Sequence, residues 1–330
     1  MKEPVAGSLV KHRTLGQGKV VAVEATALHV FFAASESRYA AKLRWPAAEV
    51  FLSQAGLESD PWLEGLTSFT LDSAVGRYAL AVNFVSHEEA IRSYLAENPT
   101  GFGATGTGAP RRSRAARWRA ACHAWTSALG NNQAEKLLRD GDYRELARRA
   151  LRVAACAAPI PGMIGTDVLE EAFEAGDKVH HYFDALAGYL SVPSPARARF
   201  ERLCAASSVL GIPSDDAWTM VTFFPFAAVP GRHMVFVPHS AAAAANRLGC
   251  ALQHQAAPNW ATYVRLRDLS WRLLEKLAPS GARDLVDVEC FLHATGARRP
   301  AVSPSRARKS GPENGKKVGP SVRPKPRRKR

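Results

Sequence analysis

The stretch "GSLVKHRTLGQGKVVAVE", residues 7–24, decides how the chain begins. Its two glycines, Gly16 and Gly18, precede a run of valines, and this spacing suits either a phosphate-binding loop or a tight β-hairpin. A phosphate loop needs the Walker pattern that ends in Lys-Ser/Thr, or a third glycine in G-x-G-x-x-G between a strand and a helix. Here the third position is Val21 and the following sequence is strand-like. The pair therefore indicates a hairpin turn in which glycine adopts a positive φ.

Short strands are expected over residues 7–52, because apolar and polar side chains alternate there. Leu28, Val30 and Phe32, for example, share one face of a strand. Several short strands in so small a segment favour a curled barrel over an open sheet, whose edges would stay unpaired. The predicted strands are Leu9–His12, Lys19–Val23, Leu28–Phe32, Arg38–Trp45 and, with less regular alternation, Glu49–Leu52.

The spacing Gly7-x-x-Val10-x-His12-x-x-x-Gly16-x-Gly18-x-Val20, followed by "LHVFF" and a basic strand, resembles a known module. It is similar to the Tudor-like module at the C-terminus of UvrD-type helicases and, more distantly, to the polymerase-interacting module of CarD-like transcription regulators. The resemblance covers about residues 5–53 and departs from the helicases in its N-terminal position and its lack of helicase motifs. It implies an SH3-like barrel that docks on RNA polymerase or another protein. The residues assigned to that contact are Arg38, Lys42 and Arg44, with Gly16, Gly18 and His12 shaping the turn.

Helices are expected after Leu52, separated by Pro, Gly, Ser and Asn. Besides the one that opens at Ser86, they are predicted at about 117–129, 142–156, 167–175, 178–190, 196–210, 214–224, 241–248, 260–277 and 282–294, and the longest has a buried stripe from Tyr263 to Leu277. A capping box formed by Ser86 and Glu89 opens one of them. The run "HMVFVP" at 233–238 is predicted to be an isolated strand, and the later helices look like the helical part of uncharacterised bacterial proteins that carry the same barrel. The sequence thus predicts an α+β multi-domain chain: a barrel over 1–55, a helical connector with a Gly-rich link over 56–110, an α-helical domain over 111–296 and a disordered basic tail over 297–330.

Positive charge is concentrated in two places. Residues 298–330 contain 13 Lys and Arg against one Glu, so they carry +12 of the net +14. A second block, "RRSRAARWR", spans 111–119. Each cation that neutralises a phosphate releases a counterion, which gives affinity for nucleic acid without sequence preference. The predicted nucleic-acid-binding residues are Arg111, Arg112, Arg114, Arg117, Arg119, Arg306, Arg308, Lys309, Lys316, Lys317, Arg323, Lys325, Arg327, Arg328, Lys329 and Arg330.

Other patterns favour simpler interpretations. Arg144, Arg148 and Arg152 form one ridge of a predicted helix, which suits a water-facing surface better than a nucleic acid backbone. The five cysteines lie dozens of residues apart, so they form no zinc or disulfide signature. No metal, nucleotide or other cofactor is expected. The longest apolar run, 217–229, is too short to span a membrane and contains a proline, so we expect a cytoplasmic protein with no membrane contact.

Three functional hypotheses fit these features. The preferred one is a non-enzymatic accessory protein at DNA or the transcription machinery, with the barrel docking a protein and the tail binding nucleic acid. The second is a nucleic acid-modifying enzyme that the barrel targets, although no nucleophile motif supports covalent catalysis. The third is a protein-interaction scaffold whose tail meets acidic protein surfaces.

Overall fold

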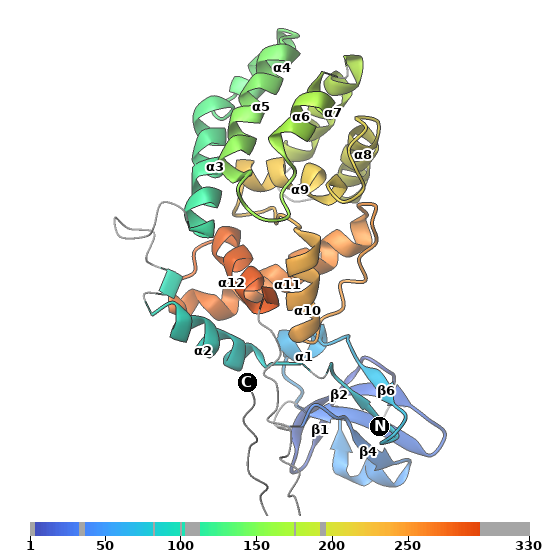
Figure 1. Ribbon diagram of the computed structural model, residues 1–330. Helices are drawn as coiled ribbons and strands as arrows, with labels where there is room; N and C mark the ends of the chain where they lie inside the picture. The colour runs from blue at the N-terminus through green and yellow to red at the C-terminus, as the bar shows by residue number, and fades with distance from the viewer. Residues whose placement is uncertain are drawn as a thin grey trace, which may run out of the picture. The chain divides into compact units, whose positions relative to one another are not determined.

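The computed structural model describes residues 4–32, 37–81, 83–99, 101–102, 113–174, 176–191 and 196–297. The chain divides into two compact units, residues 1–298 and 299–330, and the first contains every residue described. In this unit an antiparallel, curled sheet at the N-terminus precedes a helical region (Figure 1). The predicted order of strands first and helices afterwards is confirmed.

The N-terminal sheet has five strands in the order β4-β3-β2-β1-β5, and each neighbouring pair is antiparallel. The register between β2 and β3 shifts between Val20 and Ala22, a β-bulge that bends the strand and increases its twist. A short 3-10 helix, η1, occupies most of the segment where the last strand was predicted and runs directly into β5. The elements are β1 (Leu9–His12), β2 (Gly16–Val23), β3 (Ala27–Phe32), β4 (Ala41–Arg44), η1 (Ala47–Phe51) and β5 (Leu52–Ser53).

Strand β3 is buried on both faces, whereas the alternating pattern predicted only one buried face. On the concave side Val30 and Phe32 belong to a core that also includes residues of β1, β2 and β5. On the opposite side Phe31 packs with Leu63 and Leu80. The second face is buried because residues from 62 to 84, which follow the sheet in sequence, cover it.

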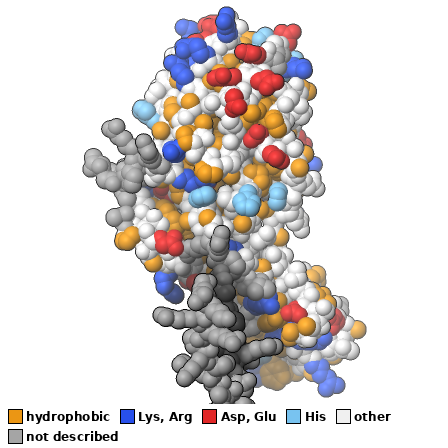
Figure 2. All heavy atoms as spheres, viewed as in Figure 1, with side chains coloured by type: hydrophobic (Ala, Val, Ile, Leu, Met, Phe, Trp, Pro, Cys, Tyr) orange, Lys and Arg blue, Asp and Glu red, His pale blue; other side chains and the backbone are white. Residues whose placement is uncertain are grey.

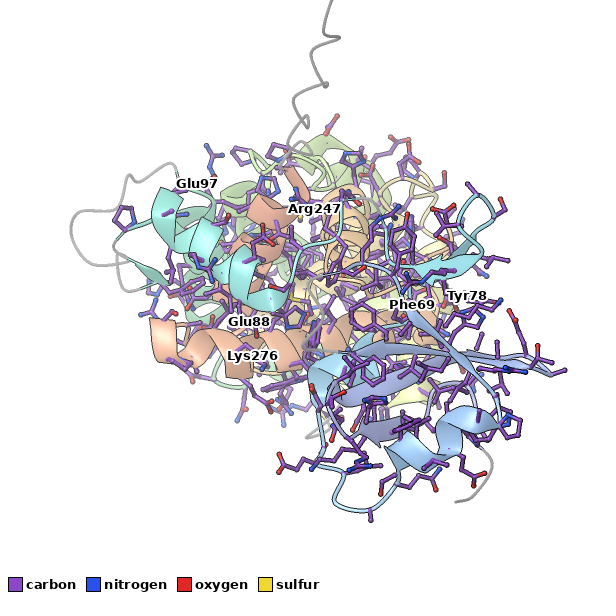
Figure 3. The ribbon with its side chains drawn as sticks, turned by 90° about the horizontal axis from the view of Figure 1, so that it is seen from below. Phe69, Tyr78, Glu88, Glu97, Arg247 and Lys276 are labelled. Atoms are coloured by element: carbon purple, nitrogen blue, oxygen red, sulfur yellow. The ribbon has the colours of Figure 1, made fainter. Side chains whose placement is uncertain are left out.

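A helix and a β-hairpin provide this cover: α1 (Pro61–Gly65), β6 (Thr70–Asp72) and β7 (Arg77–Ala79). Phe69 and Tyr78 lie against the sheet (Figure 3), and Phe69 is 5.5 Å from the Phe31 ring. Lys19 of β2 donates hydrogen bonds from Nζ to the carbonyl oxygens of Glu64 at 2.6 Å and Leu66 at 2.8 Å. Burial lowers the pKa of this amine.

The longest predicted helix of the helical region is confirmed. Helix α11 begins and ends where its apolar stripe predicts, and the side chain of Asn259 caps it by accepting from the Thr262 amide. Helices α1 and α4 and the hairpin β6–β7 were not predicted. The helices are α2 (His87–Glu97), α3 (Arg114–Ala128), α4 (Gln133–Arg139), α5 (Tyr143–Ala157), α6 (Thr166–Phe173), α7 (Asp177–Leu190), α8 (Arg197–Ser208), α9 (Ala217–Ala228), α10 (Pro238–Arg247), α11 (Trp260–Leu277), η3 (Ala278–Ser280) and α12 (Leu285–Ala297).

One large hydrophobic core joins these helices, with α3 against α5 and α9, α7 against α8, and α10 against α12. The prediction of a strand at 233–238 is wrong. Met234 to Val237 are buried but pair with no strand, because the Phe236 amide donates to the Thr222 hydroxyl of α9 at 2.9 Å. The hydroxyl of a helix side chain thus accepts the hydrogen bond of a backbone amide that the sequence assigned to a strand. No helix in the described ranges is both long and apolar enough to cross a bilayer.

Candidate functional site

The β1–β2 hairpin shows why its glycines are needed. Gly16 has a φ of +75°, which suits the turn. Gly18 does not have a positive φ, so that part of the prediction is wrong. A Cβ atom at Gly18 would instead lie 2.6 Å from Phe32 Cδ1 and 2.7 Å from Val30 Cγ1. The first glycine serves the turn, and the second makes room for the side chains of the neighbouring strand.

His12 organises the same turn. Its Nδ1 accepts hydrogen bonds from the backbone amides of Thr14 and Leu15, both at 3.2 Å. Its ring lies between two phenylalanines, with centroid distances of 5.6 Å to Phe32 and 6.1 Å to Phe51. The imidazole therefore links the hairpin to the end of η1.

Three large apolar side chains, one on this turn and two on η1, remain exposed. Leu15 is 41% exposed, Val50 77% and Phe51 49%. The Arg13 amide donates to the Phe51 carbonyl at 3.2 Å, which fixes the turn against η1. We call Leu15, Val50 and Phe51 the Phe51 patch. Sequence alternation did not identify it, because the patch comes from a turn and a 3-10 helix.

The three residues assigned to partner binding lie in different environments. Arg38 donates to the Leu80 carbonyl and to the Tyr39 hydroxyl, and its guanidinium lies 4.6 Å from the Tyr39 ring centroid. Lys42 forms an ion pair with Glu24 at 3.3 Å. Arg44 is exposed and has no ion pair with any carboxylate in the described part of the chain. Arg38 thus contributes to the contact between the segment before β4 and the hairpin β6–β7.

The basic block near residue 114 is joined to helix α12. Arg114 donates from Nε to Glu289 Oε2 at 2.9 Å, and the indole of Trp118 donates to the same carboxylate. Arg119 bridges Asp284 and Asp287. Glu289 and Asp287 are almost fully buried, so these pairs connect α3 to α12 inside the protein.

Arg117 also has an interaction within the structure. The remaining predicted nucleic-acid-binding residues lie outside the described residues: Arg111, Arg112, Arg306, Arg308, Lys309, Lys316, Lys317, Arg323, Lys325, Arg327, Arg328, Lys329 and Arg330.

Surface pockets open between the described helices, and two of them are lined by charged side chains. One, about 380 Å³, lies between α5, α6 and α7 and is lined by both charged and apolar side chains. The other, about 390 Å³, has Trp218 and Val237 in its wall, with His239, His254 and Asp215 also lining it. Within the described ranges, no three His, Cys, Asp or Glu side chains are arranged to hold a metal ion.

Comparison of the chain with protein-family models, with curated proteins and with solved structures finds no match.

Proposed function

We propose that this chain is a non-enzymatic accessory protein that works at DNA or on the transcription machinery. In this proposal the N-terminal curled sheet is an SH3- or Tudor-like barrel that docks on a protein partner, and RNA polymerase is the first partner to test. The basic tail, residues 297–330, binds nucleic acid without sequence preference.

The Phe51 patch is the observation that carries the proposal. Single exposed apolar residues are common on protein surfaces, whereas several of them on one turn and on the 3-10 helix that is hydrogen-bonded to it favour a contact site. The patch is held by backbone and imidazole hydrogen bonds, so a partner would meet a preformed surface. Lys11 and Arg13 next to it are exposed, which favours a partner with an acidic and apolar surface.

The strand order supports the barrel part of the proposal. The last strand, β5, pairs with the first, β1, while β2, β3 and β4 follow as a meander. A bulge in β2 gives the sheet the curvature that a small barrel requires. The apolar core enclosed by the curl includes Val10, Val20 and Val30, each fully buried.

The ion pairs of Arg114 and Arg119 on α3 limit which residues can bind nucleic acid. Breaking a buried ion pair leaves an uncompensated charge, which costs about 3–5 kcal/mol. Arg114 and Arg119 are therefore poor phosphate ligands while α3 stays on α12. We assign nonspecific binding to the tail, where 13 cations occur with one carboxylate.

Partner capture by the full-length protein tests the docking surface. Val50→Glu with Phe51→Glu places two charges on the patch without removing buried side chains. The matched control is Leu71→Glu with Val75→Glu, since these residues are 54% and 51% exposed on the β6–β7 hairpin. We expect the first variant to lose at least about tenfold in capture of RNA polymerase purified from the cells that express the chain, and the control to retain it. Equal capture by both variants, or none by the native chain, would refute docking through this patch on polymerase.

Deleting residues 298–330 tests the tail. The slope of log affinity against log salt counts neutralised phosphates at about 0.9 each, so a tail that uses half of its cations contributes a slope of about 6. We expect the truncated chain to bind DNA more weakly and with a correspondingly flatter slope, measured by fluorescence anisotropy. Capture of the protein partner should not change. An unchanged slope would move nucleic acid binding to another part of the chain.

A further inference from the structure

The pocket between α5, α6 and α7 has an apolar wall that is suited to a small organic molecule. Leu151 of α5, Phe173 of α6 and Val179 of α7 contribute to it. Tyr143 and His180 also line the pocket, and their rings stack with centroids 3.8 Å apart. The volume of about 380 Å³ lies in the lower part of the range typical of small-molecule sites.

Opposite charges line the pocket from different helices. Arg144 and Arg148 are four residues apart on α5, so they lie on one face of that helix. Glu170 lies on α6, and Glu174 is the residue that directly follows the last turn of α6. Figure 2 shows basic and acidic side chains gathered close together over the upper helices.

These charges do not neutralise one another. Arg148 pairs with Glu145 on its own helix. Among the residues that the structure describes, Arg144, Glu170 and Glu174 form no ion pair, although they line one pocket. A ligand that carries both charges could pair with the cationic and the anionic side at the same time, whereas a ligand with a single charge would meet repulsion from one of them.

We propose that this pocket binds a small zwitterion with an apolar body, the chemistry of apolar amino acids and their dipeptides. The carboxylate pairs with Arg144, whose planar guanidinium can hold both oxygens. The ammonium pairs with Glu170 or Glu174, and the apolar body contacts Phe173. This binding site is independent of the Phe51 patch and of the tail.

Isothermal titration of the full-length protein tests the proposal with two probes, L-leucine and L-leucyl-L-leucine, which differ in the separation of their charges. Each probe is compared with its N-acetylated and its C-amidated form, which keep the apolar body and remove one of the zwitterion's two charges. We expect at least one zwitterion to bind, and both of its single-charge forms to bind at least about tenfold more weakly. Absence of binding by both zwitterions, or equal binding by a single-charge form, overturns the proposal.

Matched substitutions locate the binding. Arg144→Gln and Glu174→Gln with Glu170→Gln each remove charge from the pocket. Arg152→Gln and Glu171→Gln are the controls, because these exposed residues lie on the same two helices but do not line the pocket. We expect about a tenfold loss of affinity from the pocket variants and less than a twofold change from the controls. A similar loss from the controls overturns the assignment to this pocket.

Discussion

Lowering the pH from 7 to 5 should destabilise this protein because of two buried histidines. His87, at the start of α2, and His233, before α10, are each 1% exposed. Among the described residues, neither Nδ1 nor Nε2 of either imidazole has a hydrogen-bond partner. Burial lowers the pKa of both imidazoles to about 3. Nearby cations contribute to these lowered pKa values after burial: Lys276 and Arg272 at His87, and Arg232 and Arg267 at His233.

The direction in which the free energy of unfolding changes with pH follows from the histidine pKa values of the folded and unfolded states. An unfolded histidine takes up its proton near pH 6.5, while the folded protein keeps these two neutral until about pH 3. The stability is therefore fully present above pH 6.5 and is lost as the pH falls below that value. Each group contributes about 1.4 kcal/mol per pH unit in this window. Between pH 6.5 and 5.0 the loss is about 2 kcal/mol per histidine and about 4 kcal/mol for the two.

This loss can be measured by urea unfolding with tryptophan fluorescence as the readout. The measurement is repeated at half-unit steps from pH 7.5 to 5.0 at constant ionic strength. His87→Gln and His233→Gln each remove one titrating group and should each reduce the slope by about 1.4 kcal/mol per pH unit. His181→Gln is the control, since His181 is exposed on α7. A free energy of unfolding that stays constant from pH 7 to 5, or a slope that survives both substitutions, would refute the reasoning.

Two further predictions concern the hairpin and the α3–α12 contact. Gly18→Ala should destabilise the protein by about 1–3 kcal/mol through overpacking, and Gly16→Ala by about 1 kcal/mol through its positive φ, both measured by urea unfolding. A Gly18→Ala variant as stable as the native chain would contradict the close contact with Phe32. Glu289→Ala should cost about 3–5 kcal/mol, because Arg114 and Trp118 lose their shared acceptor; a loss below about 1 kcal/mol would show that the pair is not structural.

The sequence was sufficient for elements whose signals are local. The stripe from Tyr263 to Leu277 predicts α11 because every residue of the stripe lies on one helical face, and those residues are buried. Ser86 caps α2 as its capping-box position predicts. The period-two pattern of β3 identified Val30 and Phe32 as core residues for the same reason.

Contacts between residues that are far apart in the sequence could not be predicted. The block around Arg114 looks like a solvent-facing basic patch because no carboxylate lies near it in sequence. Its partner Glu289 lies 175 residues later, and only the fold brings the two together. The second buried face of β3 depends in the same way on residues 62–84. The Phe51 patch was missed because exposure in a 3-10 helix leaves no periodic pattern.

Site-specific photocrosslinking from position 51 tests the docking surface most directly. A benzoylphenylalanine at Phe51, in the full-length protein inside its own cells, reacts with whatever covers the patch, and the same residue at Leu71 reports on an exposed surface outside it. We expect a discrete adduct from position 51 that contains a subunit of RNA polymerase or of its DNA-bound complexes, and none from position 71. An absence of adduct from position 51, or the same adducts from both positions, would contradict it.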